Sequence, residues 1–322
     1  MPATDKRAAY SLFALVVLTA ACGNLSQTAV NAMMMGIVAD MGVTVELGQW
    51  LSTGYMLMLG VAVPAVTWIS KRFSARQHML LGLGLSLVGS LMCLAATGFW
   101  VLLAGRILQA VSTGTLLPFM TTIAMVSFPP GRQATAMGIA GVAMGFAPNI
   151  GPTVGGAMAS AWGWRSFFVL LAALTCVLTL CALVLVKPTK PHDAAARLDA
   201  VSLSLSTLGL GGVLLGFSNA SSFALISPYV WGPLAVGVAL CAAFIVRQKR
   251  SGNPLIDLGV FRSARFNTGF AAQNLLFASF MGVTLVVPLT WKASAAARRF
   301  RRAWCCCRVP SPRSCSTRLA AC

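Results

Sequence analysis

The chain has 322 residues, of which 57% are hydrophobic and only 9% are charged. A soluble globular protein carries about 25% charged residues, so this composition excludes a soluble domain and indicates an integral membrane protein. The formal net charge of +18 is spread over loops and a C-terminal tail, without a separate basic domain that contains stacking aromatic residues. This distribution argues against a nucleic-acid partner.

Hydrophobic runs predict an all-α fold, a polytopic bundle of transmembrane helices. One crossing requires about 20 apolar residues, and nine such runs follow one another. The predicted helices cover residues 11–35, 49–69, 79–97, 99–125, 134–160, 166–186, 200–220, 229–246 and 267–290. An uncleaved first helix is favoured over a signal peptide, because the apolar run continues past Cys22.

Polar side chains with the same i, i+3, i+7 spacing occur on the first and fourth predicted helices: Asn24, Gln27 and Asn31, and Arg106, Gln109 and Thr113. Polar groups are costly in lipid, so these stripes predict either hydrogen bonds between helices or the lining of a shared cavity. For the amides both interpretations stay open. Arg106 differs, because a buried guanidinium needs acceptors and usually marks a pathway or a structural ion pair. We predict a functional role for Arg106.

The fifth predicted helix contains the segment GIAGVAMGFAPNIGPTVGG, residues 138–156. Glycines and prolines are concentrated in it, many of them three or four positions apart: Gly138, Gly141, Gly145, Pro148, Gly151, Pro152, Gly155 and Gly156. Small residues at this spacing let another backbone approach closely, and each proline removes a backbone donor and bends the helix. The segment predicts either ordinary tight packing or an interface that moves.

Basic residues predict the orientation of the chain. If the N-terminus is cytoplasmic, 14 of the 16 basic residues before position 292 fall on the cytoplasmic side: Lys6, Arg7, Lys71, Arg72, Arg76, Arg132, Lys187, Lys190, Arg197, Arg247, Lys249, Arg250, Arg262 and Arg265. The exceptions are Arg106, within a span, and Arg165, on the outer side. Asp40 and Glu46 are expected in the first outer loop. The positive-inside rule therefore favours a cytoplasmic N-terminus.

None of the six acidic residues is expected at mid-membrane, and both histidines, His78 and His192, are expected in cytoplasmic loops. The sequence thus predicts no residue suited to intramembrane protonation, although a proton-driven carrier usually needs one. No metal site, cofactor site, phosphate-binding loop or catalytic constellation is predicted either. The chain is therefore not expected to be an enzyme.

The tail over 291–322 has eight basic residues, no acidic residue and five of the ten cysteines. After nine crossings this tail should lie outside, where so many positive charges contradict the positive-inside rule. We expect that the tail is out of frame and that the authentic protein continues past Leu289. A natural basic tail is the alternative. Cys305, Cys306 and Cys307 are adjacent, so they cannot all turn onto one tetrahedral metal ion.

Seven segments carry a family pattern: LSQTAVNAMM (25–34), QWLSTGYML (49–57), WISKRFSARQ (68–77), LLAGRILQAVSTG (102–114), GFAPNIGPTVGG (145–156), WGWRSFF (162–168) and the block 198–261. Together they resemble the major facilitator superfamily, in its fourteen-span drug:proton antiporter branch of the EmrB/QacA and lincomycin-resistance type. This sequence departs from the family pattern in two segments. Ser26 and Gln27 occupy the region of the usual first-helix acid, and Lys71 and Ser74 replace a usual aspartate and glycine.

The resemblance implies a division of the chain into five parts: an N-terminal six-helix bundle (1–186), a cytoplasmic linker (187–199), two inserted helices (200–246), the start of a C-terminal bundle (247–290) and the tail (291–322). It assigns Arg106 to coupling and the groove over 145–156 to a conformational interface. Residues Lys71, Arg72 and Arg76 would form a cytoplasmic gate.

The resemblance further implies an inner-membrane carrier, surrounded by lipid, that exports small amphipathic substrates against inward proton movement by alternating access. Such a carrier needs two bundles around a central site, and about five helices of the second bundle are missing. This chain is therefore expected to be a truncated product that is inactive alone. The rival hypotheses are a non-transporting remnant or assembly partner, and a solute importer of the same fold.

Overall fold

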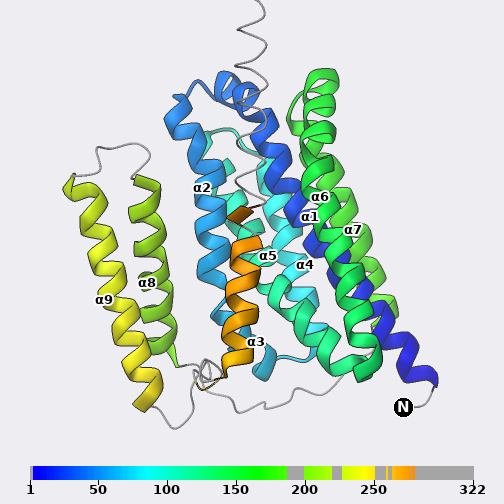
Figure 1. Ribbon diagram of the computed structural model, residues 1–322. Coiled ribbons are helices and arrows are strands. Elements are labelled where there is room, and N and C mark those ends of the chain that lie inside the picture. Colours follow the sequence, from blue (N-terminus) through cyan, green and yellow to red (C-terminus); the bar gives the residue numbers. More distant parts are fainter. Residues whose placement is uncertain are drawn as a thin grey trace, which may run out of the picture. The chain divides into compact units, whose positions relative to one another are not determined.

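The computed structural model describes residues 3–186, 199–219, 227–250, 259, 263–276 and 278–279, which form helices and turns without any strand. The chain divides into two compact units, Met1–Ile256 and Asp257–Cys322. The helices of the first unit are α1 (Ala3–Met41), α2 (Val45–Ala62), α3 (Ala65–Arg72), α4 (Ala75–Leu94), α5 (Phe99–Ser127), α6 (Pro130–Trp162), α7 (Arg165–Leu185), α8 (Ala200–Asn219) and α9 (Pro228–Arg250) (Figure 1). In the second unit residues 264–276 are helical. The predicted all-α fold class is confirmed.

Six of the described helices are long and apolar enough to cross a membrane: Tyr10–Met41, Ala75–Leu94, Phe99–Ser127, Arg165–Leu185, Val201–Asn219 and Pro228–Lys249. α2 and α6 are not among them, although the sequence predicts crossings at 49–69 and 134–160. α2 has only 18 residues and carries Glu46 and Gln49 near its start, and α6 is rich in glycine.

Three predicted segments lie wholly or partly outside the described residues. They are the linker over 187–199, of which Asp199 alone is described, the tail over 291–322 and half of the crossing at 267–290, namely 277 and 280–290.

The sequence predicts one continuous helix over 49–69, and this prediction is wrong at Pro64. α2 ends at Ala62 and the eight-residue α3 begins at Ala65. Proline has no backbone N–H, and its ring clashes with the carbonyl four residues earlier, so the helical hydrogen-bond ladder stops there. The amide of Val63 donates to the carbonyl of Gly60, only three residues back, over 3.3 Å. α3 is therefore a separate short helix.

The sequence places Asp40 and His78 in loops, and both placements are wrong. α1 continues to Met41 and stops at Gly42, whose φ of 62° lies in the left-handed region that glycine adopts readily. α4 starts at Ala75, because Ser74 and Gln77 form a capping box that satisfies amides of the first turn. Asp40 therefore belongs to the last turn of α1, and His78 to the first turn of α4.

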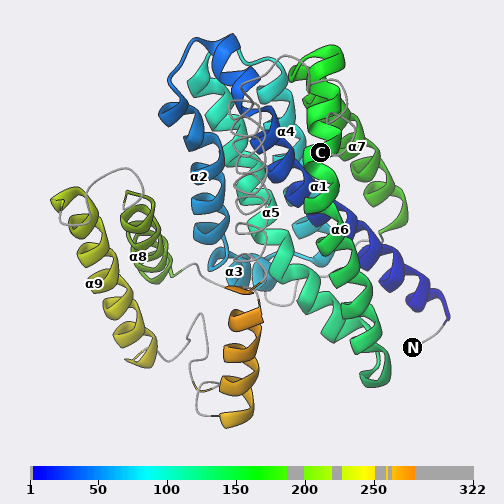
Figure 2. The ribbon, with the colours of Figure 1, turned by 45° about the horizontal axis from the view of Figure 1, so that its top comes forward.

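α5 packs on α1, α2 and α4, which lie around it (Figures 1 and 2). Glycines allow the closest of these contacts. A Cβ at Gly89 of α4 would lie 2.6 Å from the carbonyl oxygen of Gly105 on α5, so the two backbones touch. Small residues bring membrane helices together in this way, where the hydrophobic effect contributes little. The side chain of the next residue, Arg106, is thereby held inside the bundle.

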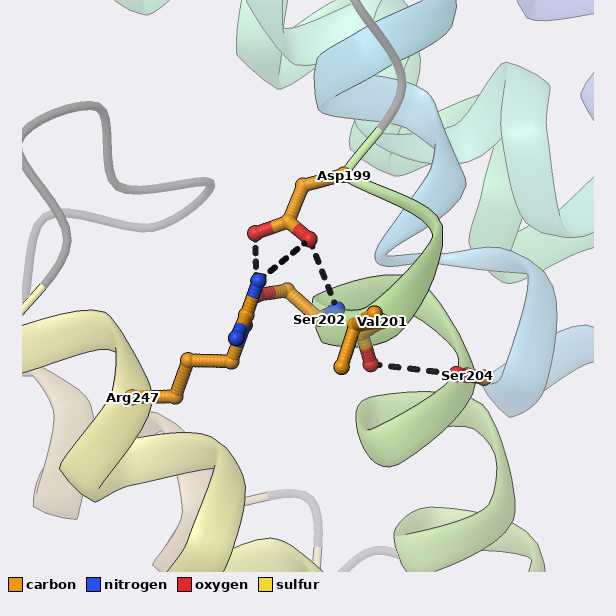
Figure 3. A network of polar contacts seen from close by, with 5 residues as sticks. All are labelled: Asp199, Val201, Ser202, Ser204 and Arg247. Atoms are coloured by element: carbon orange, nitrogen blue, oxygen red, sulfur yellow. Dashed lines mark hydrogen bonds and ion pairs between the residues drawn. The ribbon is translucent and has the colours of Figure 1, made fainter.

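α8 and α9 pack along each other as a pair. A Cβ at Gly212 would lie 2.9 Å from the Cα of Gly237, so this contact also requires glycine. At one end of the pair, Asp199 accepts the amide of Ser202 at 3.1 Å and forms an ion pair of 3.1 Å with Arg247 (Figure 3). The hydrogen bonds from Ser202, together with Arg247, hold the pKa of the Asp199 carboxyl below its usual value.

Candidate functional site

Arg106 of α5 is fully buried, and its guanidinium bonds directly to α1 and reaches α4 through Gln109. Its Nη1 donates to Ser26 Oγ on α1 at 2.7 Å and to Gln109 Oε1 on α5 at 2.8 Å. The amide nitrogen of Gln109 in turn donates to Ser90 Oγ on α4 at 3.0 Å. These side chains form one polar network in an otherwise apolar core.

The face of the guanidinium is covered by an aromatic ring from α2. The Cζ atom of Arg106 lies 4.3 Å from the centroid of the Tyr55 ring, which is a cation–π contact. The hydroxyl of Tyr55 donates to the carbonyl of Gly23 at 3.1 Å and lies 2.8 Å from Thr113 Oγ1. Tyr55 is itself fully buried, and both its ring and its hydroxyl are held by these contacts.

No carboxylate neutralises Arg106 among the described residues, whose ion pairs are Arg165–Asp40 and Arg247–Asp199. The Nε and Nη2 atoms of Arg106 are buried and have no hydrogen-bond partner there. A buried N–H without an acceptor costs about 1–3 kcal/mol, and more where the donor is charged. The site therefore presents a fixed positive charge with two unpaired donors, which suits an oxygen acceptor or an anion.

The structure brings only part of the predicted polar stripes together. Ser26, and not one of the three amides, is the α1 residue that reaches Arg106. Asn24 donates to Met144 Sδ on α6 at 3.1 Å, and Asn31 is exposed and accepts a hydrogen bond from Ser52 on α2. Gln27 is half-buried.

Sequence reasoning missed Ser26, Ser90 and Tyr55 as members of the Arg106 network. A signal for Ser26 was present, because it occupies the region of the first-helix motif in which an acid is usual. Tyr55 lies within the second-helix segment QWLSTGYML. No pattern in the sequence singles out Ser90.

The glycine-rich segment of α6 has two different faces. Gly151 and Gly155 pack on α1, where a Cβ at Gly151 would lie 2.9 Å from the Leu25 carbonyl oxygen and one at Gly155 would lie 2.8 Å from the Ala29 Cβ. The remaining glycines of the segment would meet no atom of the described residues within 4 Å: Gly138, Gly141, Gly145 and Gly156. Of the two prolines, Pro148 is half-buried and Pro152 is exposed. The segment thus combines a tight contact with an open face.

The predicted gate residues lie on two helices. Lys71 and Arg72 end α3, and the side chain of Arg72 is exposed. Arg76 lies in the first turn of α4 and donates from Nη2 to the Leu183 carbonyl at the end of α7, over 2.9 Å. A cation there complements the negative end of the helix dipole of α7. Arg76 therefore connects α4 to α7.

Arg165, the basic residue that contradicts the predicted charge pattern, is paired at the opposite end of the bundle. Its Nη1 lies 2.9 Å from Asp40 Oδ2, which also accepts the indole N–H of Trp164 at 3.0 Å. Its Nη2 donates to the Ala96 carbonyl at 3.2 Å. Asp40 and Arg165 thus join the end of α1 to the start of α7.

An open groove of about 360 Å³ lies between α2 and α5 and has an apolar lining. Its walls are Leu47, Trp50, Gly54, Leu57, Met58, Phe99, Trp100, Leu103 and Ile107. Within the described ranges, no group of three or more His, Cys, Asp or Glu side chains could hold a metal ion.

Residues 16–307 match the sequence profile of the Major Facilitator Superfamily. This match covers most of the chain, and the chain therefore belongs to this superfamily of membrane transporters. The superfamily expected from the motifs is confirmed.

Three relatives illustrate the relationship. Lincomycin resistance protein LmrB of Bacillus subtilis is 34% identical over 277 residues, which cover 85% of this chain and 57% of that protein. The uncharacterized MFS-type transporter YcnB of the same organism is 32% identical over 265 residues, or 82% and 56% of the two chains. The multidrug resistance protein B homolog of Mycobacterium tuberculosis is 30% identical over 277 residues, or 84% and 51%. The chain spans about half the length of these curated relatives.

Among solved structures, a bacterial homologue of the human lysosomal transporter Spinster aligns with a TM-score of 0.47 and 13% identity, over 81% of this chain and 66% of that one.

Proposed function

We propose that the chain is part of a fourteen-span efflux permease, which exports small amphipathic compounds in exchange for protons by alternating access. The proposal is supported by relatives that are named for resistance to lincomycin or to several drugs.

The observation that carries the proposal is the state of Arg106. A guanidinium that is fully buried and has two unpaired donors is costly, and membrane proteins retain such residues chiefly on transport pathways. We propose that Arg106, with Gln109, serves coupling, and that Asn24, Gln27 and Asn31 line the same pathway.

The two faces of α6 fit a conformational interface. We propose that the open glycine face, with Gly141, Gly145 and Gly156, contacts the second bundle, and that Pro148 and Pro152 let α6 bend during the transition. Gly151 and Gly155 hold α6 on α1. Lys71, Arg72 and Arg76 would form the gate at the end of the bundle that carries α3.

The orientation is part of the proposal: a multi-pass protein of the plasma membrane with its N-terminus and the 187–199 linker in the cytosol. The expected division also belongs here, with 200–246 as inserted helices, 247–290 as the start of the second bundle and 291–322 as an out-of-frame tail. An impermeant thiol reagent should fail to label a cysteine introduced at Lys190 in intact cells. Labelling from outside would contradict this orientation.

The direct test is dye efflux from cells that express the permease with its second bundle. Arg106→Ala should abolish efflux while membrane levels stay unchanged, because the fixed charge is lost. Arg106→Lys keeps the charge but loses the planar guanidinium group with its several N–H donors, and it should retain part of the efflux activity. Arg165→Ala is the matched control, because Arg165 is half-exposed and its ion pair contributes little. Normal efflux by Arg106→Ala would contradict the role of Arg106.

The rival hypotheses make different predictions. A non-transporting remnant or assembly partner predicts that the 322 residues expressed alone do not change dye accumulation. Efflux by this chain alone would exclude that hypothesis, and it would contradict our expectation that a second bundle is required. A solute importer predicts higher, not lower, accumulation in cells that express the permease with its second bundle.

A further inference from the structure

His78 is the described side chain that combines full burial with an imidazole, the group whose unperturbed pKa is near neutral. Its exposed fraction is 0%. The described carboxylates of Asp40 and Glu46 are exposed, and that of Asp199 lies outside the crossings. An intramembrane ionisable residue is a candidate functional site, and His78 plays no part in the Arg106 network.

The imidazole of His78 lies between two helices other than its own. Its Nδ1 is 3.3 Å from Ser70 Oγ on α3, and its ring centroid is 4.1 Å from that of Phe119 on α5, with the planes 32° apart. Its Nε2 is buried and has no hydrogen-bond partner among the described residues. A buried polar atom without a partner requires an explanation, and one such explanation is a functional proton.

The other polar groups around His78 that belong to the described residues do not provide a counter-charge. α3 ends with the cations Lys71 and Arg72, and Arg76 on α4 is engaged with the Leu183 carbonyl of α7. α7 carries at this end the thiol of Cys181, and the turn of α5 around Phe119 carries no ionisable residue. A charged imidazolium would therefore have one acceptor, Ser70 Oγ, and the π face of Phe119.

These two contacts are too weak to hold a buried charge. A cation–π contact contributes about 0.5–2 kcal/mol, whereas an ion taken out of water costs several kcal/mol. Protonation thus requires water at the ring, and water can enter if α3 separates from α4. α3 is suited to this movement, because it has only eight residues and the helical ladder is interrupted at Pro64 on its α2 side.

We propose that His78 is the proton-binding residue of this chain and that it takes up a proton only when α3 separates from α4. Proton binding and separation then favour each other, because a ligand that binds one of two states shifts the equilibrium toward that state. Separation increases as the pH falls, and docking of α3 expels the proton. The role of this step in antiport rests on the function proposed above, whereas the proton site itself does not.

Hydrogen–deuterium exchange of the α3 amides tests the proton site without any transport assay. The purified 322-residue chain is compared in lipid nanodiscs at pH 8.0 and pH 5.5, after correction for the pH dependence of intrinsic exchange. A hydrated imidazole titrates at about pH 6.5, so the opening constant of α3, and with it the corrected exchange rate, should rise about tenfold at the lower pH.

Three variants complete the experiment. His78→Gln can keep a hydrogen bond to Ser70, and His78→Phe can keep the stacking on Phe119, but neither titrates. Both should lose the tenfold response, and either one suffices if the other does not fold. His192→Gln, which removes the other histidine of the chain, should respond as the wild type does.

An equal exchange rate of α3 at the two pH values in the wild type would overturn the proposal. A response that persists in a folded His78 variant would overturn it as well. The two proposals fail separately. If α3 responds through His78 but the permease with its second bundle does not export dye, the proposed function is wrong and the proton site stands. If dye export is proton-driven and α3 does not respond, the proton site is wrong.

Discussion

Arg106 on α5 and Ser26 on α1 are joined by a hydrogen bond of 2.7 Å between Nη1 and Oγ. This contact connects a buried cation directly to the helix in which the first-helix motif of the expected branch commonly has an acid. A serine hydroxyl supplies an acceptor there, but it supplies no negative charge.

Introducing a carboxylate at this position should stabilise the bundle. In Ser26→Asp the new carboxylate can pair with Arg106, whereas Ser26→Asn has nearly the same size and no charge. Removing a partner from a buried charge is strongly destabilising, and restoring one should have the opposite sign. We expect a higher thermal midpoint for Ser26→Asp than for Ser26→Asn, measured by intrinsic fluorescence in detergent. The reverse order would show that the site does not accept an anion.

Two glycines of α6 should respond differently to the same substitution. Gly151→Ala places a Cβ against the backbone of Leu25, and such overpacking costs about 1–3 kcal/mol. Gly145→Ala meets no described atom, and alanine is favoured over glycine in a helix by about 0.5–1 kcal/mol. Thermal unfolding of this chain should therefore rank Gly145→Ala above the wild type and Gly151→Ala below it.

The same Gly145→Ala variant tests the proposed interface when the second bundle is present. If the open face of α6 contacts that bundle, a methyl group there should reduce dye efflux although stability is not reduced. Unchanged efflux would place the interface elsewhere.

The start of α4 should depend on the capping box formed by Ser74 and Gln77. Ser74→Ala removes the side-chain acceptor of the Gln77 amide and should cost about 1 kcal/mol, whereas Ser74→Gly should cost only a few tenths. Both losses in the free energy of unfolding are measured from the ratio of folded to unfolded chain in a denaturant titration. Equal losses for the two variants would mean that the cap contributes nothing.

The pH dependence of the contact between α8 and α9 follows from Asp199. Its folded-state pKa is depressed, first by the hydrogen bond from the Ser202 hydroxyl and then by the Ser202 amide and Arg247. The Asp199 carboxylate therefore contributes fully to stability above the unfolded pKa of about 3.9. This contribution is lost as the pH falls through the lower pKa of the folded state. We expect no change in this contact between about pH 5 and pH 8.

Two variants separate the cap from the ion pair at Asp199. Asn is as good an N-cap as Asp, so Asp199→Asn removes only the charge and should cost about 0.2–1 kcal/mol. Asp199→Ala also removes the acceptor of the Ser202 amide and should cost about 1 kcal/mol more. The hydrogen–deuterium exchange rates of the α8 amides measure the loss of stability in each variant. Equal losses in Asp199→Asn and Asp199→Ala would contradict the capping role of Asp199.

The all-α fold and the central arginine could be predicted because both depend on local chemistry. A long apolar run specifies a membrane helix whatever its neighbours are, and Arg106 is conspicuous inside such a run. What hydropathy does not specify is which face of a helix meets which neighbour. The sequence contains a polar stripe on α1, but the contact with Arg106 is made by Ser26, one position from Gln27.

The starts and interruptions of helices were harder to predict, since single side chains decide them. Pro64 interrupts an apolar run that reads as one crossing, and Ser74 begins α4 before its apolar run begins. The second of these effects moves His78 from an expected loop into the buried interior. The hypothesis of a proton site depends on that shift, and composition alone gave no sign of it.

The contact of Gly151 and Gly155 with α1 has a mechanical consequence. Neither glycine places a side chain between the two helices there, and close-packed surfaces of this kind transmit displacement instead of absorbing it. Leu25, whose carbonyl oxygen Gly151 approaches, directly precedes Ser26 in the sequence. A tilt of α6 is therefore transmitted through α1 to the Ser26 hydroxyl, which accepts the hydrogen bond from Arg106. The orientation of α6 thus determines whether this hydrogen bond between α1 and α5 is kept.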